Sequence, residues 1–342
     1  MQRIMVTGGA GFIGSNFARM MLEKHPDYHI IVYDKMTYAG NPDNLMDLQD
    51  NPRFLFVKGD IADPAKVDET IQQLSIDTIV NFAAETHVDR SIEDPGSFIQ
   101  TNVLGVHTLL EAVRKFGLEK MLHVSTDEVY GAVLEGSSTE TDLLEPRSPY
   151  SAAKAGGDLM CLAYHVTHNT PVMVTRGSNT YGPRQYPEKL LPLFISNAIE
   201  DKPLPVYGDG KYIRDWMYVL DHCDGIDTVL HSDEPGQIYN IGGGNERENI
   251  EVIYTLLDLL DKPKSLINYV QDRPGHDRRY SIDTTKLQAL GWSPKWSLED
   301  GLRETVNWYV ENRSWWEKIK SGEFAEYYAR MYEQRKVLAK HG

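Results

Sequence analysis

Two short groups of polar residues in the chain have the types and the spacing that proton transfer requires. The first is Tyr150 and Lys154, which stand four positions apart, so that a helix places them one turn apart on one face. A free tyrosine has a pKa of about 10 and is a weak base at neutral pH, but neighbouring positive charges favour its phenolate. Tyr150 is therefore a candidate base for taking a proton from a hydroxyl group as hydride leaves the same carbon.

The second group is Thr126, Asp127 and Glu128, which follow an apolar run. Two adjacent carboxyl groups divide the roles of acid and base only if their pKa values are split. In isolation, Asp127 and Glu128 would be better explained as solvated charges at the start of a loop. Together with Tyr150 and Lys154, the acid–base pair is the stronger interpretation.

A glycine-rich turn near the start of the chain is typical of a dinucleotide site. Gly8, Gly11 and Gly14 follow the first apolar run and open a helical stretch. Glycines at this spacing allow a tight turn and a close approach of the backbone to a pyrophosphate at a helix N-terminus. Asp34 ends the second apolar run, twenty residues after Gly14. An acidic residue there accepts hydrogen bonds from a ribose diol and repels a 2′-phosphate, so NAD is favoured over NADP.

A folded domain must hold these groups in place, and the first half of the chain has the sequence pattern of such a domain. Short apolar runs rich in β-branched residues alternate with helix-length segments, which predicts a doubly wound parallel sheet of the α/β class. The expected strands are residues 4–7, 30–33, 54–57, 78–81, 121–124 and 172–175, and expected helices include 13–24, 97–116 and 150–167.

The regular alternation of strand and helix segments ends near residue 181, where loops rich in proline and glycine begin. We expect residues 1–180 to form a Rossmann-type NAD-binding domain, with residues 221–245 rejoining it. Residues 181–342 should form mainly a smaller, mixed α/β lobe. The tryptophans of the C-terminal stretch are better explained as packing residues than as a cofactor site; they are Trp292, Trp296, Trp308, Trp315 and Trp316.

Composition narrows the class of protein further. The net charge of −15 argues against a nucleic-acid surface, so an anionic ligand must be attracted by local donors. Cys161 and Cys223 cannot build a disulfide framework, and no Cys/His spacing indicates a metal site. The chain has no signal-peptide pattern and no apolar run near ~18 residues, which predicts a cytoplasmic protein without a membrane span.

With Asp60-Ile61 and Ala83-Ala84 added to these motifs, the sequence resembles the extended short-chain dehydrogenase/reductases. Within them it is most similar to the dTDP-glucose 4,6-dehydratases, because the acid pair Asp127-Glu128 is absent from the epimerases of the same superfamily. The stretches that carry the resemblance are residues 83–91, 125–131, 181–183, 186–189, 214–216 and 272–280.

The resemblance implies that NAD⁺ oxidises C4 of the sugar, that water is eliminated across C5 and C6, and that hydride returns to C6. It implies Tyr150, Thr126 and Lys154 for C4 oxidation, Asp127 as the acid and Glu128 as the base. The cofactor residues that it implies are Gly8, Gly11, Phe12, Ile13, Gly14, Asp34, Lys35, Thr37, Asp60, Ile61, Ala83, Ala84, Thr86, Thr101, Tyr150, Lys154 and Asn179.

The substrate residues follow from the same resemblance. Arg214, Arg273 and His276 are expected to supply positive charge to a diphosphate, and Asn249 and Tyr280 to flank the nucleotide. Arg278 and Arg279 are better explained as surface ion pairs. The whole substrate set is Thr86, Thr126, Thr180, Glu188, Lys189, Leu190, Pro205, Tyr207, Arg214, Asn249, Arg273, His276 and Tyr280.

One position departs from the family pattern. The family usually reads Arg-Cys-Ser-Asn-Asn, whereas this chain has Gly177 at the second position and Thr180 at the fifth. Threonine keeps a donor and an acceptor on a shorter arm, so the substrate contact made by the second Asn is expected to shift or to pass through water. A UDP- or CDP-sugar dehydratase and a nucleotide-sugar 4-epimerase remain alternatives. The resemblance also implies a homodimer, in which the helices of residues 102–116 and 150–167 pair with those of a partner.

Overall fold

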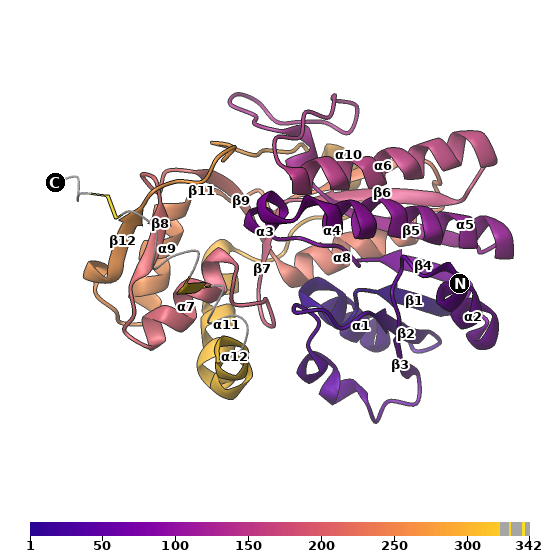
Figure 1. Ribbon diagram of the computed structural model, residues 1–342, viewed down its shortest axis with the longest axis horizontal. Coiled ribbons are helices and arrows are strands. Elements are labelled where there is room, and N and C mark those ends of the chain that lie inside the picture. Colours follow the sequence, from indigo (N-terminus) through magenta and orange to yellow (C-terminus); the bar gives the residue numbers. More distant parts are fainter. Residues whose placement is uncertain (322–327, 330–336, 339–342) are drawn as a thin grey trace.

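The computed structural model describes residues 1–321, 328–329 and 337–338; residues 322–327, 330–336 and 339–342 of the expected second lobe lie outside this part. A seven-stranded parallel sheet, at the right of Figure 1, forms the centre of the larger lobe, in the order β10-β6-β5-β4-β1-β2-β3. Its strands are β1 (Arg3–Thr7), β2 (His29–Asp34), β3 (Phe54–Lys58), β4 (Thr78–Asn81), β5 (Lys120–Thr126), β6 (Val172–Gly177) and β10 (Ile238–Ile241). The predicted doubly wound α/β sheet is confirmed.

Strand residues alternate between two buried layers, because successive side chains of a strand point to opposite faces of the sheet. In β1, Ile4 and Val6 belong to one hydrophobic cluster and Met5 to the other. Two helices cover the first face, α1 (Phe12–Lys24) and α8 (Val219–Leu230); three cover the second, α2 (Pro64–Leu74), α5 (Val106–Phe116) and α6 (Pro149–His168). Both faces of the sheet are therefore dry, as its apolar runs predict.

The second lobe contains two small sheets and a set of helices, at the left of Figure 1. One sheet consists of β7 (Asn179–Tyr181), β9 (Ile213–Tyr218) and β11 (Glu246–Glu248), and the other of β8 (Leu204–Tyr207) and β12 (Ile267–Val270). The helices of this half of the chain, besides α8, are α7 (Leu190–Ile199), α9 (Asn249–Leu259), α10 (Thr285–Gln288), α11 (Leu298–Glu311) and α12 (Arg313–Lys320), with a 3₁₀ turn at Lys264–Leu266.

The segment from residue 97 to 116, expected as one helix, is divided. The short helices α3 (Val88–Glu93) and α4 (Pro95–Ile99) lead into a π-helical turn at Gln100–Gly105, and only then does α5 begin. The wide turn directs the Asn102 side chain back to the loop after β4, where its Oδ1 accepts from Glu85 N at 2.9 Å and its Nδ2 donates to Glu85 O at 3.0 Å. Turns of this kind are frequent at functional sites, and this one anchors a loop beside the candidate site.

Several tryptophans and two arginines lie where the sequence predicts them, and the structure also locates the two cysteines. Trp292, Trp315 and Trp316 are buried in the core, and Cys161 and Cys223 are buried free thiols. The expected surface ion pairs are present, Arg278 with Asp209 and Arg279 with Glu246. Within the described part of the chain, no helix has the length and apolar character that crossing a bilayer needs.

Candidate active site

A cavity of about 310 Å³ opens at the carboxyl ends of the parallel strands, where open α/β sheets bind ligands. It is lined by all of the residues expected to bind a cofactor and by the five expected to carry the chemistry. These are Gly8, Gly11, Phe12, Ile13, Gly14, Asp34, Lys35, Thr37, Asp60, Ile61, Ala83, Ala84, Thr86, Thr101, Thr126, Asp127, Glu128, Tyr150, Lys154 and Asn179.

The glycine turn between β1 and α1 fits a group that approaches the backbone closely. Gly8 has φ +67°, and a Cβ there would lie 2.6 Å from Ala83 N; a Cβ on Gly14 would lie 2.5 Å from Gly8 O. Gly11, the N-cap of α1, offers no side-chain cap to the first turn of the helix. The backbone N–H groups of that turn are therefore left facing the cavity, as an anionic pyrophosphate requires.

Asp34 and Lys35 form the far end of this cavity. The Asp34 carboxylate accepts from Ala10 N at 3.0 Å and from Met36 N at 2.8 Å, and each oxygen keeps a further lone pair for a ribose hydroxyl. Lys35 forms an ion pair with Asp60 at 2.7 Å, so its charge is balanced by a carboxylate. This arrangement fits a ribose diol better than a 2′-phosphate.

Tyr150 and Lys154 lie on the first turns of α6, which begins behind an N-cap at Ser148 and a proline at the first helical position. Tyr150 forms a hydrogen bond with Thr126, which lowers its pKa, but burial and the charge of Glu128 raise that pKa further, well above its usual value. Lys154 Nζ donates to Val124 O at 2.7 Å, and burial lowers its pKa to about 8. The lysine therefore does not by itself produce the phenolate that the sequence predicts.

Asp127 and Glu128 begin a 3₁₀ turn, Asp127–Tyr130, directly after β5. Asp127 is 3% exposed, and burial, followed by the charge of Glu128, raises its pKa to about 8. Burial also raises the pKa of Glu128, but Arg273, Arg214 and Lys189 oppose that rise. The two carboxyl groups thus have unequal surroundings, and Asp127 is the one held protonated at neutral pH.

A second cavity of about 170 Å³ adjoins the first, and Glu128, Asn179, Glu188 and Lys189 line both. It contains most of the residues expected to bind substrate: Glu188, Lys189, Leu190, Pro205, Tyr207, Arg214, Asn249, Arg273, His276 and Tyr280. Thr86, Thr126 and Thr180, which belong to the same expected set, line the first cavity instead. Glu128 therefore stands where the two cavities meet, and Asp127 lines the first cavity beside it.

Positive charge in the second cavity comes from arginines. Arg214 is held by Asp277 O at 2.9 Å and lies over the Tyr280 ring at 4.3 Å. Arg273 contacts Asp89 at 3.3 Å, while its buried Nε has no hydrogen-bond partner among the described residues. An unsatisfied buried donor beside a second guanidinium is suited to an anionic ligand such as a diphosphate.

His276 does not supply the positive charge expected of it. Burial and the charges of Arg273 and Arg214 lower its pKa to about 4, so the ring is neutral at pH 7. The imidazole instead stacks on Tyr212, with ring centroids 3.8 Å apart, and its Nδ1 lies 2.8 Å from Asp272 Oδ1. The lowered pKa disfavours the positive charge expected of His276, while the ring lines the second cavity as expected.

Thr180, which departs from the family pattern, forms hydrogen bonds within the protein. The Thr180 hydroxyl donates to Ser178 O at 3.1 Å and lies 2.8 Å from Nδ1 of the buried His222. The ring of His222 occupies the space beside Gly177, where an added Cβ would lie 2.7 Å from Nε2. The three residues Gly177, Thr180 and His222 thus pack against one another. The Thr180 hydroxyl uses its hydrogen bonds within the protein.

Some lining residues escaped the sequence interpretation. His222 and Gln185 line the first cavity, but neither stands at a spacing that signals chemistry; Glu85 lines it too and belongs to the stretch 83–91. His87 and Asp89 line the second cavity, and their place in the stretch 83–91 was the available signal.

Comparison with known proteins agrees with this geometry. The family model described as GDP-mannose 4,6 dehydratase matches residues 5–305. The chain is 49% identical over 340 residues to dTDP-glucose 4,6-dehydratase of Xanthomonas campestris pv. campestris (strain B100), covering 94% of this chain and 96% of that protein.

Solved structures give the same result. The dTDP-glucose 4,6-dehydratase DesIV of Streptomyces venezuelae, solved with NAD bound, superposes with a TM-score of 0.91 at 49% identity, covering 93% of this chain and 100% of that one. A UDP-glucuronic acid 4-epimerase of Bacillus cereus has a TM-score of 0.85 at 31% identity, covering 91% and 99%. The chain belongs to the dTDP-glucose 4,6-dehydratase family of the extended short-chain dehydrogenase/reductases.

Proposed function

We propose that this protein is an NAD-dependent enzyme that dehydrates dTDP-glucose to the 4-keto-6-deoxy sugar. The larger lobe holds NAD in the first cavity through the glycine turn, the free N-terminus of α1 and Asp34. The second cavity holds the diphosphate and the nucleotide through Arg214, Arg273 and neighbouring residues. The hexose then lies between the two, beside Tyr150 and the acid pair.

The first half of the reaction is carried by Tyr150. When bound, NAD⁺ supplies a hydride acceptor for C4, which later returns the hydride to C6, and a positive nicotinium charge that favours the phenolate. Tyr150 takes the proton of the sugar 4-hydroxyl, and the hydrogen bond from Thr126 stabilises the phenolate. Lys154, fixed on Val124 O, adds positive charge to the same end of the cavity.

The second half is carried by the acid pair. A ketone at C4 acidifies the C5 proton, which Glu128 removes as a carboxylate. Asp127, protonated because its pKa is about 8, donates its proton to the C6 hydroxyl, which leaves as water. Glu128 then returns a proton to C5 after C6 has received hydride. Tyr150 has by then gained one proton and Asp127 has lost one, so the total on the protein is unchanged. One proton must pass from Tyr150 to Asp127 before the next turnover.

The single observation that carries the proposal is the placement of two adjacent carboxyl groups in unequal electrostatic surroundings next to Tyr150, with Asp127 in the first cavity and Glu128 where the two cavities meet. A 4-epimerase needs the tyrosine and NAD but no acid pair, since no C–O bond breaks.

The test is to incubate the purified protein separately with dTDP-glucose, UDP-glucose and UDP-GlcNAc, and to identify the products by mass. Loss of one water from dTDP-glucose, with no net change in the cofactor, is the expected result. A product of unchanged mass and altered sugar configuration would indicate epimerisation, and turnover of the UDP-sugars in preference would contradict the proposed nucleotide.

A further inference from the structure

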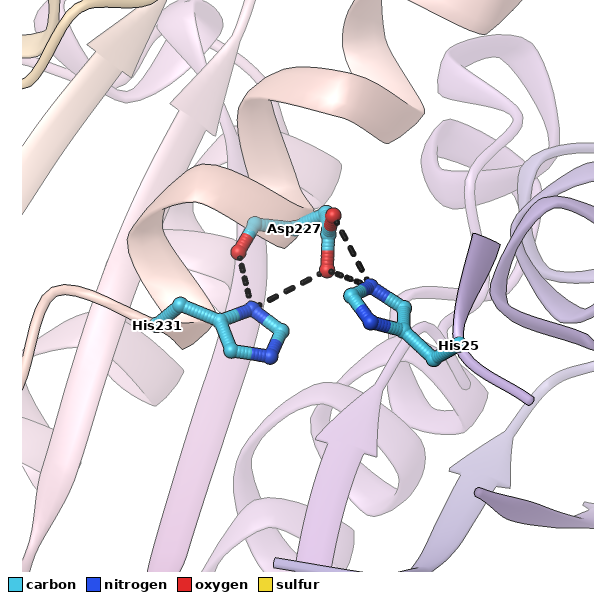
Figure 2. Close-up of side chains that lie close together, drawn as sticks. All are labelled: His25, Asp227 and His231. Carbon is cyan, nitrogen blue, oxygen red and sulfur yellow. Dashed lines mark hydrogen bonds and ion pairs between the residues drawn. The ribbon is translucent and has the colours of Figure 1, made fainter. Parts of the chain in front are cut away.

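Two histidines and an aspartate meet at the end of the sheet opposite the candidate active site. His25 caps the C-terminus of α1, whereas Asp227 and His231 lie one turn apart near the C-terminus of α8. Because α1 begins at the carboxyl end of β1, its last residue lies at the amino ends of the strands. Figure 2 shows both imidazole rings turned toward the Asp227 carboxylate.

The three side chains converge on one oxygen. His25 Nε2 and His231 Nδ1 each lie 3.1 Å from Asp227 Oδ1. All three ligand atoms lie within 4.8 Å of one another. Bonds of about 2.0–2.1 Å around a tetrahedral ion separate its ligand atoms by about 3.3–3.4 Å. The two N···O separations are within a few tenths of an ångström of that spacing. His231 Nδ1 also lies 2.8 Å from the backbone oxygen of Asp227, and the two imidazole rings are stacked with centroids 4.9 Å apart. Closing the site therefore requires the half-exposed His231 ring to leave that carbonyl and to tilt out of the stack toward His25.

The surroundings hold the ligands in place. His25 is fixed by its backbone, which donates to Met21 O at 3.0 Å and accepts from Arg53 at 2.9 Å. The other ring nitrogen of His231 lies 2.9 Å from the Tyr28 hydroxyl. A partner of this kind orients a ligating imidazole and fixes its tautomer, as outer contacts of metal sites do.

One cation competes for the carboxylate. Lys24 Nζ lies 2.7 Å from Asp227 Oδ2, the oxygen that the two histidines do not share, and 2.9 Å from Asp224. Oδ1 therefore remains available to a metal while Lys24 stays in place. Asp224 offsets only part of this positive charge, because it also pairs with Lys295 at 2.9 Å. A divalent ion must therefore compete with Lys24 for the Asp227 carboxylate.

We propose that His25, Asp227 and His231 form a binding site for a divalent transition-metal ion of the zinc type, with water as the fourth ligand. Two imidazoles and one carboxylate suit Zn²⁺ better than Mg²⁺ or Ca²⁺, which prefer oxygen ligands. The ion would join the ends of α1 and α8, far from the acid pair, and therefore act on stability and not on the reaction.

The experiment is calorimetric titration of tag-free, chelator-treated protein with Zn²⁺, with Co²⁺ as a spectroscopic probe. The wild-type chain is expected to bind one equivalent that gives the visible absorption of tetrahedral Co²⁺ and raises Tm. His25→Gln and His231→Gln should each weaken this binding by roughly tenfold or more. Glutamine keeps a hydrogen bond to Asp227, so a plain hydrogen-bonded cluster would survive the change.

Two further variants sharpen the test. Lys24→Met removes the competing ammonium and is expected to tighten Zn²⁺ binding; weaker binding would contradict the proposal. His168→Gln, at an exposed histidine on α6, is the matched control and should bind as the wild type does. The proposal is overturned if the wild type takes up no stoichiometric Zn²⁺ at micromolar concentration, or if His25→Gln leaves the binding unchanged.

Discussion

At the residue scale, the chemistry depends on two carboxyl groups that are adjacent in sequence but differ in their electrostatic surroundings. Burial raises the pKa of both. The charge of Glu128 raises that of Asp127 further, whereas three cations oppose the rise at Glu128. The same covalent group is therefore held as an acid at one position and kept closer to a carboxylate at the next. This division allows one turn of backbone to donate a proton and accept another during the same elimination.

Replacing Glu128 with glutamine tests the role of base. Glutamine keeps the size and the hydrogen-bonding reach but cannot take a proton, so C4 oxidation should survive while loss of the C5 proton slows by roughly 10²-fold or more. The measurement is the absorbance of enzyme-bound NADH after mixing with substrate, together with exchange of C5 hydrogen for solvent deuterium. Tyr150→Phe is the matched control, because it should suppress NADH formation itself. Wild-type turnover of Glu128→Gln would show that another group is the base.

The pH profile tests the role of Asp127. Its pKa is raised to about 8, and the reaction uses the protonated form, so activity is present below that pH and is lost as pH rises through it. Lys154 also has a pKa of about 8 and acts as a cation, so we expect kcat/KM, which reports groups of the free enzyme, to fall with two ionisations in this region. Asp127→Asn should reduce this fall to one ionisation and remove most of the activity. A wild-type profile that stays flat to pH 10 would exclude Asp127 as the acid.

Asp34 leads to a prediction about the cofactor. Its carboxylate faces the position of the ribose hydroxyls and would repel a 2′-phosphate. Lys35 forms an ion pair with Asp60, so its charge is not available to attract one. Protein denatured directly after purification should release NAD(H). Recovery of NADP(H) in the released nucleotide, identified by mass, would contradict this assignment.

Much of the site was predictable from residue types, because Tyr150, Lys154 and the glycine turn carry their chemistry in their spacing. What spacing cannot give is the protonation state, since it depends on burial and on charges distant in sequence. His276 shows this plainly: the resemblance implies a cation, but the nearby Arg214 and Arg273 keep the ring neutral. Likewise, nothing in the sequence indicated that Thr180 would bind His222.

At the element scale, the turn that carries the acid pair is held by a buried polar chain. Arg176 Nε donates to Asp158 Oδ2 at 2.9 Å and its NH1 to the Tyr130 hydroxyl at 2.8 Å, which in turn donates to Asn240 at 2.8 Å. This chain joins β6, α6, β10 and the end of the turn that begins at Asp127. Removing one member of a buried ion pair typically costs about 3–5 kcal/mol, so the network can fix the turn rigidly.

The junction of β6 and α8 gives a prediction about packing. Gly177→Ala adds a methyl group 2.7 Å from the His222 ring, which Thr180 holds in place, so we expect a loss of about 1–3 kcal/mol in the free energy of unfolding. The measurement is urea unfolding. Gly96→Ala is the control, because the nearest atom to its new Cβ is Asp94 Oδ1 at 3.5 Å and alanine favours a helix. Equal stability of both variants would show that the ring moves freely.

The strands were predictable because short continuous apolar runs rich in β-branched residues are typical of strands that are buried on both faces of a sheet. The break in the segment 97–116 was not, because its residues read as one continuous helix. The π-helical turn depends on Asn102 reaching the backbone of Glu85, a contact over 17 residues that no local pattern records. Long-range hydrogen bonds of this kind override helical propensity.

At the scale of the whole molecule, an acidic protein must attract an anionic substrate. The net charge of −15 opposes a nucleotide sugar at long range. The opposing local field comes from Arg214, Arg273 and Lys189, which face the second cavity from different segments of the chain. These cations lie within low-dielectric walls, where their attraction is strongest and least screened by salt.

Apolar side chains remain exposed on the helices that flank the second face of the sheet, which leads to a last prediction. Ile99 is 54% exposed, Leu104 47% and Leu159 56%, and their segments α4, the π-helical turn and α6 contact one another. We propose that this surface pairs with a second copy of the chain, so light scattering at micromolar concentration should give a homodimer with little dependence on salt. Leu159→Lys places a charge in that surface and should yield monomers, whereas Met46→Lys, at an equally exposed position on the 3₁₀ turn Pro42–Leu48, should remain dimeric. A wild-type monomer under these conditions would contradict the pairing, and the exposed leucines would then need another partner.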